Sequence, residues 1–189
     1  ITPGRHKFGL AQLSALLHDI GKPTTRILGE EGRFHYFAHD NVGAELAWAA
    51  AKRIQLSNAG SDWVKQFVGG HMGLQTWTHS DKLPTRRSIY RFFKKLGDVG
   101  VAIALFSLAD SLATHGENIP YIKWEKHLEI IAILYSTWWE EKDMVVSPTP
   151  LINGYDLQKD FGLKPGKMIG VLLADLVEAQ ASGDVNSLD

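Results

Sequence analysis

The sequence predicts an all-α protein: a helical bundle followed by a small helical C-terminal segment. Apolar residues recur at helical spacing over most of the chain, and Gly, Pro and capping residues separate these segments, while no convincing pair of strand patterns occurs. The chain has 189 residues, about the length of one domain, and 44% of them are hydrophobic. One core can therefore be buried without disulfides, which the absence of cysteine excludes.

The first helix is marked by Leu13, Leu17 and Ile20, and we expect Gly21 to end it. This segment is apolar almost all round, which predicts a helix in the middle of the bundle. Residues 24–37 hold two Gly and several charges, so we expect a loop with at most a short extended piece.

Capping residues and glycines divide the next part of the chain into five further helices. Asp40 or Asn41 is expected to cap the second helix, and Ser61 or Asp62 the third. The predicted helices end near residue 54, near residue 71, before Gly97, at residue 115 and at residue 140. Residues 143–154 are rich in Pro and Gly and predict a linker, followed by helices at 155–161 and about 166–181. The expected division is a helical domain at 1–140 and a linker with a C-terminal helical segment at 141–189.

Charge and composition narrow the function. Twenty basic and twenty-one acidic residues give a net charge of −1, which argues against a protein that coats polyanions but allows a local basic patch. Any transition metal must be held by His, Asp or Glu. The apolar stretch 99–113 is short for a bilayer and contains an Asp, so we expect a soluble cytoplasmic protein without a membrane partner. Because the chain opens on Ile1, we also expect it to be a piece of a longer protein.

Two carboxylates stand among apolar residues. His18 and Asp19 follow a leucine-rich stretch, and Asp110 lies within a segment that otherwise has a core composition. An ionised carboxylate in such a place costs several kcal/mol unless it is paired or bound to metal. These three residues predict a divalent metal held by N and O ligands. The alternative is a His–Asp hydrogen bond, with the carboxylates satisfied by basic side chains such as Lys22.

The other histidines fall into two groups. His39, with His35 nearby, precedes a predicted helix, and His71 ends another. His39 and His71 are candidates for a second metal or a phosphate, since a helix start favours anions; the alternative is ordinary surface or core histidine. The remaining histidines have no chemical context, and we expect them at the surface; these are His6, His79, His115 and His127.

Four segments, taken in order, resemble the HD superfamily of metal-dependent phosphohydrolases. They are LLHDIGKP at 16–23, FHYFAHDNVGAELA at 34–47, GGHM at 69–72 and LAD at 108–110. The resemblance is strongest to the HD domain of bacterial tRNA nucleotidyltransferases and poly(A) polymerases. Residues 151–185 are similar to the RNA-binding segment that follows the HD domain in those enzymes.

The resemblance implies roles for the matching residues. His18, Asp19 and Asp110 would be metal ligands, and His39 and His71 would bind a second metal or the substrate phosphate. Asp19 would also orient the attacking water, and Lys22 would approach the phosphate. The superfamily has another histidine on a preceding helix, and His6 lies too close to His18 to be it. The nucleotidyltransferase head is also missing, so this piece alone cannot add nucleotides.

Two functions follow from this resemblance. The first is a phosphohydrolase that uses a divalent ion (Mg, Mn, Ni, Fe or Zn) and acts on phosphoester bonds of nucleotides or RNA ends. The second is a catalytically degenerate HD domain that serves as scaffold and RNA-binding part of a tRNA nucleotidyltransferase or poly(A) polymerase. Lys164 and Lys167, beside Lys159 and the start of the last predicted helix, are the candidate RNA contacts, with tRNA as a possible partner.

Overall fold

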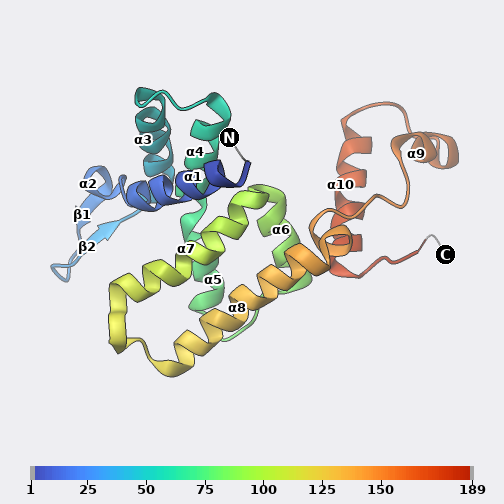
Figure 1. The fold of residues 1–189 in the computed structure, drawn as a ribbon. Helices are drawn as coiled ribbons and strands as arrows, with labels where there is room; N and C mark the ends of the chain where they lie inside the picture. Colours follow the sequence, from blue (N-terminus) through green and yellow to red (C-terminus); the bar gives the residue numbers. More distant parts are fainter. Residues whose placement is uncertain (1–2, 188–189) are drawn as a thin grey trace.

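The computed structural model describes residues 3–187, with side chains from residue 7 onward, and it is predominantly helical (Figure 1). This confirms the all-α prediction. The elements are α1 (Pro3–Leu17), α2 (Lys22–Thr25), β1 (Arg26–Leu28), β2 (Phe34–Tyr36), α3 (His39–Arg53), α4 (Asn58–Gly70), the 3-10 turn η1 (His71–Leu74), α5 (Gln75–Thr78), α6 (Arg86–Leu96), α7 (Asp98–His115), the 3-10 turn η2 (Gly116–Asn118), α8 (Tyr121–Glu140), the π-helical turn η3 (Lys142–Val146), α9 (Gly154–Phe161) and α10 (Lys167–Ser182).

A small core joins the first helices of the chain. It is formed by small and branched side chains of α3 and α4, and leucines of α1 pack against it. The expectation that α1 lies in the middle of the bundle is wrong, because Phe8 and Leu16 are 67% and 81% exposed. An apolar composition all round a helix does not show which face is covered, and here α1 is covered mainly by α4, and to a smaller extent by α3 and α7.

A larger core lies between α4, α6, α7, α8 and η3. Phe67, Ile103, Ile130 and Leu134 are fully buried in it. Val145 of η3 is also fully buried there, so the first part of the predicted linker is packed into the core. Its apolar Met-Val-Val run indicates burial more strongly than the prolines that follow it indicate a free connection.

The C-terminal segment packs on one side of this core. Helix α10 lies against α6 and η3, and α9 folds back on α10 (Figure 1). Ion pairs join α6 to the C-terminal segment: Nη2 of Arg91 lies 2.5 Å from Oε1 of Glu178 in α10, and Nη2 of Arg87 lies 2.5 Å from Oδ2 of Asp184, just after α10. The predicted helices at 155–161 and 166–181 are found within one residue of these limits.

Some helix limits differ from the prediction for a local physical reason. Helix α6 is capped by Thr85, whose hydroxyl accepts a hydrogen bond from the amide of Ser88. The cap of α4 is Ser57, whose hydroxyl accepts from the amide of Gly60; the expected caps, Ser61 and Asp62, both lie inside the helix. Helix α3 begins at His39, after Ala38 in the left-handed conformation (φ 58°), so the expected caps Asp40 and Asn41 lie inside its first turn.

The loop expected at residues 24–37 contains a two-stranded antiparallel sheet. Strands β1 and β2 pair with Arg26 opposite Tyr36 and Leu28 opposite Phe34. The prediction that the chain has no strand pair is therefore wrong in this segment. Each strand has three residues, which is too short for an alternating pattern to be distinguished.

The apolar helix α7 is longer than the stretch identified in the sequence. Together with η2 it spans Asp98–Asn118, 21 residues that include an 18-residue stretch with a mean hydropathy of 1.4, and this is long and apolar enough to cross a membrane by length and composition alone. A single such helix is weak evidence, because core helices of soluble proteins pass the same test. The stretch 99–113, which the sequence analysis takes as too short to cross a bilayer, is only part of this helix.

Candidate metal centre

His18 and Asp19 lie in a turn rather than on a helix. Helix α1 ends at Leu17, and the turn that follows leads into α2 at Lys22. The predicted placement of both residues within the first helix is therefore wrong, because that helix ends at Leu17 and not at Gly21, whose φ is −78°. Gly21 is needed for space instead: a β-carbon there would collide with the backbone oxygen of His39.

Three histidines are held in the same way. In His18, His39 and His71, Nδ1 bonds to the backbone carbonyl three residues earlier, at 2.8, 2.8 and 2.6 Å. A carbonyl can only accept, so each Nδ1 carries the proton and each neutral ring keeps the lone pair on Nε2. The same arrangement orients metal-binding histidines in proteins.

Asp19 lies between these rings. Its Oδ1 is 3.5 Å from Nε2 of His39 and 4.0 Å from Nε2 of His71. Its Oδ2 is 3.1 Å from Nε2 of His18 and 2.6 Å from Nζ of Lys22. The two carboxylate oxygens thus face different partners, the His39–His71 pair on one side and His18 with Lys22 on the other.

Asp110 reaches the same place from α7. Its Oδ1 is 3.7 Å from Nε2 of His18. The premise that led to this residue, a carboxylate buried in the core, is wrong, since the side chain is 46% exposed. The buried residues of α7 all lie between Val99 and Ala104, and Leu112, further along the helix than Asp110, is exposed.

The electrostatics of the cluster favour an ionised aspartate and a neutral histidine. Partial burial alone would raise the pKa of Asp19, but the hydrogen bond from Lys22 and the charges of His18, Lys22 and His71 together hold it below its usual value. Burial lowers the pKa of His71, assisted by the neighbouring His18 and His39 rings. His71 is therefore neutral near pH 7, with its Nε2 lone pair available.

These groups fit a metal ion. Ligand atoms of Asp19, His39 and His71 all lie within 4.8 Å of one another. Nε2 of His39 and Nε2 of His71 lie 3.3 Å apart. With both Nδ1 protons directed to carbonyls, two neutral rings would bring two lone pairs together at this distance. A cation between the rings removes that repulsion, and imidazole nitrogen with carboxylate oxygen is a donor set for divalent ions.

The remaining candidate residues lie elsewhere. His35 is exposed and stacks on Phe37. Lys164 and Lys167 are exposed at the start of α10, in the segment that packs on α6 and η3, away from the cluster. The side chain of His6 is outside the described part of the chain.

The sequence analysis predicts His127 at the surface, but the residue is buried. It is 8% exposed, and its Nε2 lies 2.9 Å from Oγ of Ser107. Its position on the buried face of α8 has no chemical signature in the sequence. His79 and His115 are exposed as expected.

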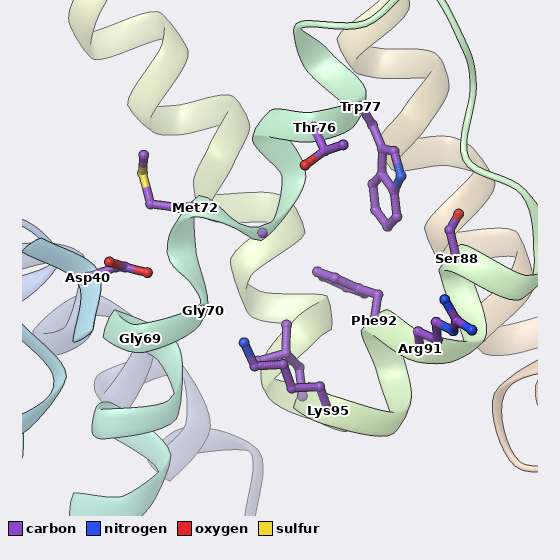
Figure 2. A pocket seen from close by; sticks show the side chains of 12 residues that line it. Asp40, Gly69, Gly70, Met72, Thr76, Trp77, Ser88, Arg91, Phe92 and Lys95 are labelled. Atoms are coloured by element: carbon purple, nitrogen blue, oxygen red, sulfur yellow. The ribbon is translucent and has the colours of Figure 1, made fainter. Parts of the chain in front are cut away.

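A pocket of about 390 Å³ lies beside the segments that carry His39 and His71 (Figure 2). Asp40, next to His39, and Gly70, next to His71, line it, and Trp77 and Phe92 face each other inside it with ring centroids 5.4 Å apart. Its arginine, Arg91, is already paired with Glu178. The pocket therefore has less spare positive charge than its residue content suggests.

Comparison with known proteins agrees with this geometry. The family model described as "HD domain" matches residues 6–115, a range that contains the whole cluster. The chain is similar to a CC-adding tRNA nucleotidyltransferase of Thermus thermophilus, with 32% identity over 94% of this chain and 37% of that protein. It is also similar to an A-adding tRNA nucleotidyltransferase of Deinococcus radiodurans, with 29% identity over 94% of this chain and 39% of that protein.

The chain thus spans less than two fifths of the length of these two relatives. The family match covers more than half of the chain and includes every residue of the cluster. On this evidence the chain belongs to the HD domain family.

Proposed function

We propose that the cluster binds a divalent metal and hydrolyses phosphoester bonds of nucleotides or RNA ends. The observation that carries this proposal is the facing pair of Nε2 atoms of His39 and His71, 3.3 Å apart and both beside Asp19. Such a pair needs a cation, and the donor set suits Mn, Ni, Fe or Zn better than Mg, which favours oxygen ligands.

The ligands divide around Asp19. His18, Asp19 and Asp110 would hold one ion, and His39 and His71 would hold a second ion or the substrate phosphate. The chemistry that a divalent ion supplies in such a site is polarisation of a phosphoryl oxygen and a lowered pKa of bound water. Asp19, ionised and held by Lys22, would accept a hydrogen bond from the attacking water and orient it.

Lys22 is the nearest positive side chain to the reacting groups. Its Nζ donates a hydrogen bond to Oδ2 of Asp19, and the residue begins the short helix α2, which borders the cluster. A phosphate bound beside Asp19 would lie within reach of this ammonium group, which would neutralise charge that develops on the phosphoryl oxygens. Removing Lys22 would therefore slow hydrolysis more than it weakens metal binding.

The relatives direct the proposal toward RNA. Both are named as enzymes that add nucleotides to tRNA, so a tRNA end is the natural substrate class for a hydrolytic domain in such a protein. A cytoplasmic protein without a membrane partner belongs to the same proposal. The division into an HD-type domain at 1–140 and a tail at 141–189, with Lys164 and Lys167 as RNA contacts, is part of it as well.

Hydrolysis of bis(p-nitrophenyl) phosphate and of p-nitrophenyl phosphate by the metal-free chain, reconstituted with each divalent ion in turn, tests this proposal. We expect activity with at least one of Mn, Ni, Fe or Zn, lost in Asp19→Asn and kept in Asp40→Asn. Asp40 is the matched control because it is an acid next to His39, at the start of α3, and is not part of the cluster. No hydrolysis with any ion would refute it.

The alternative is a degenerate HD domain that serves as scaffold and RNA-binding part of a tRNA nucleotidyltransferase or poly(A) polymerase. The observation that favours it is that the relatives carry names for nucleotide addition alone. Metal binding without hydrolysis of either phosphate ester, together with RNA affinity, would support this alternative.

A further inference from the structure

The hairpin β1–β2 exposes several large apolar side chains beside the cluster. Phe34 is 45% exposed and Phe37 is 68% exposed, and Ile27 and Leu28 are also exposed. Exposed large apolar side chains that gather on one small element are a common feature of binding sites. The hairpin extends from the α1–α3 part of the fold, at the left of Figure 1.

One face of the hairpin combines aromatic rings with cations. Residues directly opposite each other in the sheet share a face, so Arg26 and Leu28 lie on the same side as Tyr36 and Phe34. The guanidinium carbon of Arg26 is 3.6 Å from the centroid of the Phe34 ring. Nζ of Lys22 is 5.7 Å from the centroid of the Tyr36 ring. We call these four residues, Lys22, Arg26, Phe34 and Tyr36, the platform.

The platform is joined directly to the cluster. Lys22 donates a hydrogen bond to Asp19, and the backbone carbonyl of Tyr36 accepts from Nδ1 of His39. The root of the hairpin therefore lies at the groups proposed to act on the phosphoester bond, and Arg26 and Phe34 follow along the strands. An extended ligand bound along this face of the hairpin would have one end at the cluster.

Aromatic rings and cations that lie next to one another are groups that can bind the bases and phosphates of a single-stranded RNA. Unpaired bases stack on aromatic side chains and guanidinium planes, and the phosphates between them pair with Lys and Arg. We propose that the platform binds the single-stranded end of an RNA, with its terminal phosphoester bond at the cluster. This inference rests on the proposed function and names its substrate as an oligonucleotide end rather than a free mononucleotide.

The charge at the tip of the hairpin limits the length of strand that it holds. Glu30 and Glu31 are exposed in the turn between the strands and repel phosphate. The platform is therefore confined to the root of the hairpin, next to Lys22 and Arg26. A short oligonucleotide should fill it, and Glu30→Gln/Glu31→Gln should not weaken binding.

Binding of a fluorescently labelled oligoadenylate of four nucleotides, followed by anisotropy at low salt in EDTA, tests the platform. We expect Phe34→Ala to weaken binding roughly tenfold, the usual loss for one base–aromatic stack. Phe34→Trp should bind at least as well as the unchanged chain, and Phe34→Leu should bind as weakly as Phe34→Ala. Tyr121→Ala, which removes an exposed ring at the start of α8, is the control and should have no effect.

Two results would overturn the platform. Equal affinity of the unchanged chain and Phe34→Ala would show that the ring takes no part. Full affinity in Phe34→Leu would show an apolar contact, as in docking of a protein segment, and not base stacking. A circular dichroism spectrum for each variant confirms that the fold is kept.

The design separates this inference from the proposed function. Because EDTA removes metal, the binding measurement does not depend on hydrolysis. RNA binding that needs Phe34, without phosphoester hydrolysis, would support the platform and refute the phosphohydrolase. Hydrolysis of p-nitrophenyl esters by a chain whose RNA affinity ignores Phe34 would do the reverse.

Discussion

The backbone of Gly21 lies against the backbone of Gly43. A β-carbon on Gly21 would come within 2.7 Å of the amide nitrogen of Gly43, and the β-carbon of a residue at 43 would lie 3.3 Å from the amide nitrogen of Gly21. The two glycines bring the turn that carries His18 and Asp19 onto the first turns of α3, where His39 begins the helix. The distance between Asp19 and His39 therefore depends on two residues with no functional group.

Gly21→Ala should open this contact. The new methyl group would meet the carbonyl of His39, a backbone atom that can move only with α3, so Asp19 and His39 would separate. We expect metal affinity to fall by about tenfold or more, as when the support of a metal ligand is removed. Calorimetric titration with Mn²⁺ measures this loss. Gly9→Ala, where nothing lies within 4 Å of the added carbon, is the control, and an equal effect of both variants would contradict the account.

Ala38→Gly should stabilise the protein. Ala38 has a φ of 58°, a conformation that costs an alanine about 1–2 kcal/mol and costs glycine little. Glycine also gains freedom in the unfolded chain, so the net gain should be about 0.5–1 kcal/mol. Urea unfolding followed by circular dichroism measures it. A lower unfolding midpoint in Ala38→Gly than in the unchanged chain would contradict this interpretation of the turn before His39.

Sequence patterns predicted the helices wherever local signals agree. Helix α8 ends at Glu140 and α6 ends before Gly97, both as predicted. The cap of α4 was misplaced because Ser57 and Ser61 both fit a cap, and only burial distinguishes them. The hairpin was missed because its strands pair through the backbone, while their side chains follow no alternation of apolar and polar residues.

One residue of the candidate site, Asp110, differs from the sequence prediction in its burial. The sequence predicts a buried Asp110, but its side chain is 46% exposed. Sequence spacing also could not show that His39 and His71, 32 positions apart, bring Nε2 atoms to 3.3 Å. The carbonyl partners of the rings, such as that of Tyr36, carry no signal in residue type, although each stands three positions before its histidine.

The attachment of the tail should depend on pH. The hydrogen bond from Arg91 lowers the pKa of Glu178, and the positive charges of Arg91, Arg87 and Lys94 lower it further. These effects outweigh the slight desolvation of the carboxylate, which raises the pKa. A carboxyl whose pKa is lower in the folded state stabilises that state above its unfolded pKa, and the contribution is lost as pH falls through the folded pKa. Urea midpoints of the unchanged chain should therefore fall more steeply below pH 4.5 than those of Glu178→Gln.

The control for this pH dependence is Asp175→Asn, which removes an acid of the same helix that forms no ion pair with the arginines of α6 in the described part of the chain. Its midpoints should follow those of the unchanged chain. Parallel curves for the unchanged chain and Glu178→Gln would show that the pair does not hold α10 on α6.

Lys164 and Lys167 should bind RNA weakly through the start of α10. Both side chains are exposed beside a helix start, where amide groups and the helix dipole favour phosphate. Lys164→Ala/Lys167→Ala should reduce affinity for a tRNA-like hairpin and make the dependence on salt shallower by up to about two ion contacts. Anisotropy titrations at several salt concentrations measure both effects.

The matched variant is Lys123→Ala/Lys126→Ala, which removes the same charge from α8. If the two double variants weaken binding equally, the tail has no special part and only net charge matters. An unchanged affinity in Lys164→Ala/Lys167→Ala would remove these residues from the RNA-binding proposal.

The most direct test of the metal centre is the affinity of the metal-free chain for Mn²⁺, measured by calorimetric titration in the unchanged chain, Asp19→Asn and Asp40→Asn. Asp19 is the only residue that faces all three histidine rings in the described part of the chain, while Asp40 is adjacent to the cluster without belonging to it. The account predicts that Asp19→Asn weakens binding by about 100-fold or more and that Asp40→Asn leaves it unchanged. Equal Mn²⁺ affinity in the unchanged chain and Asp19→Asn would contradict it.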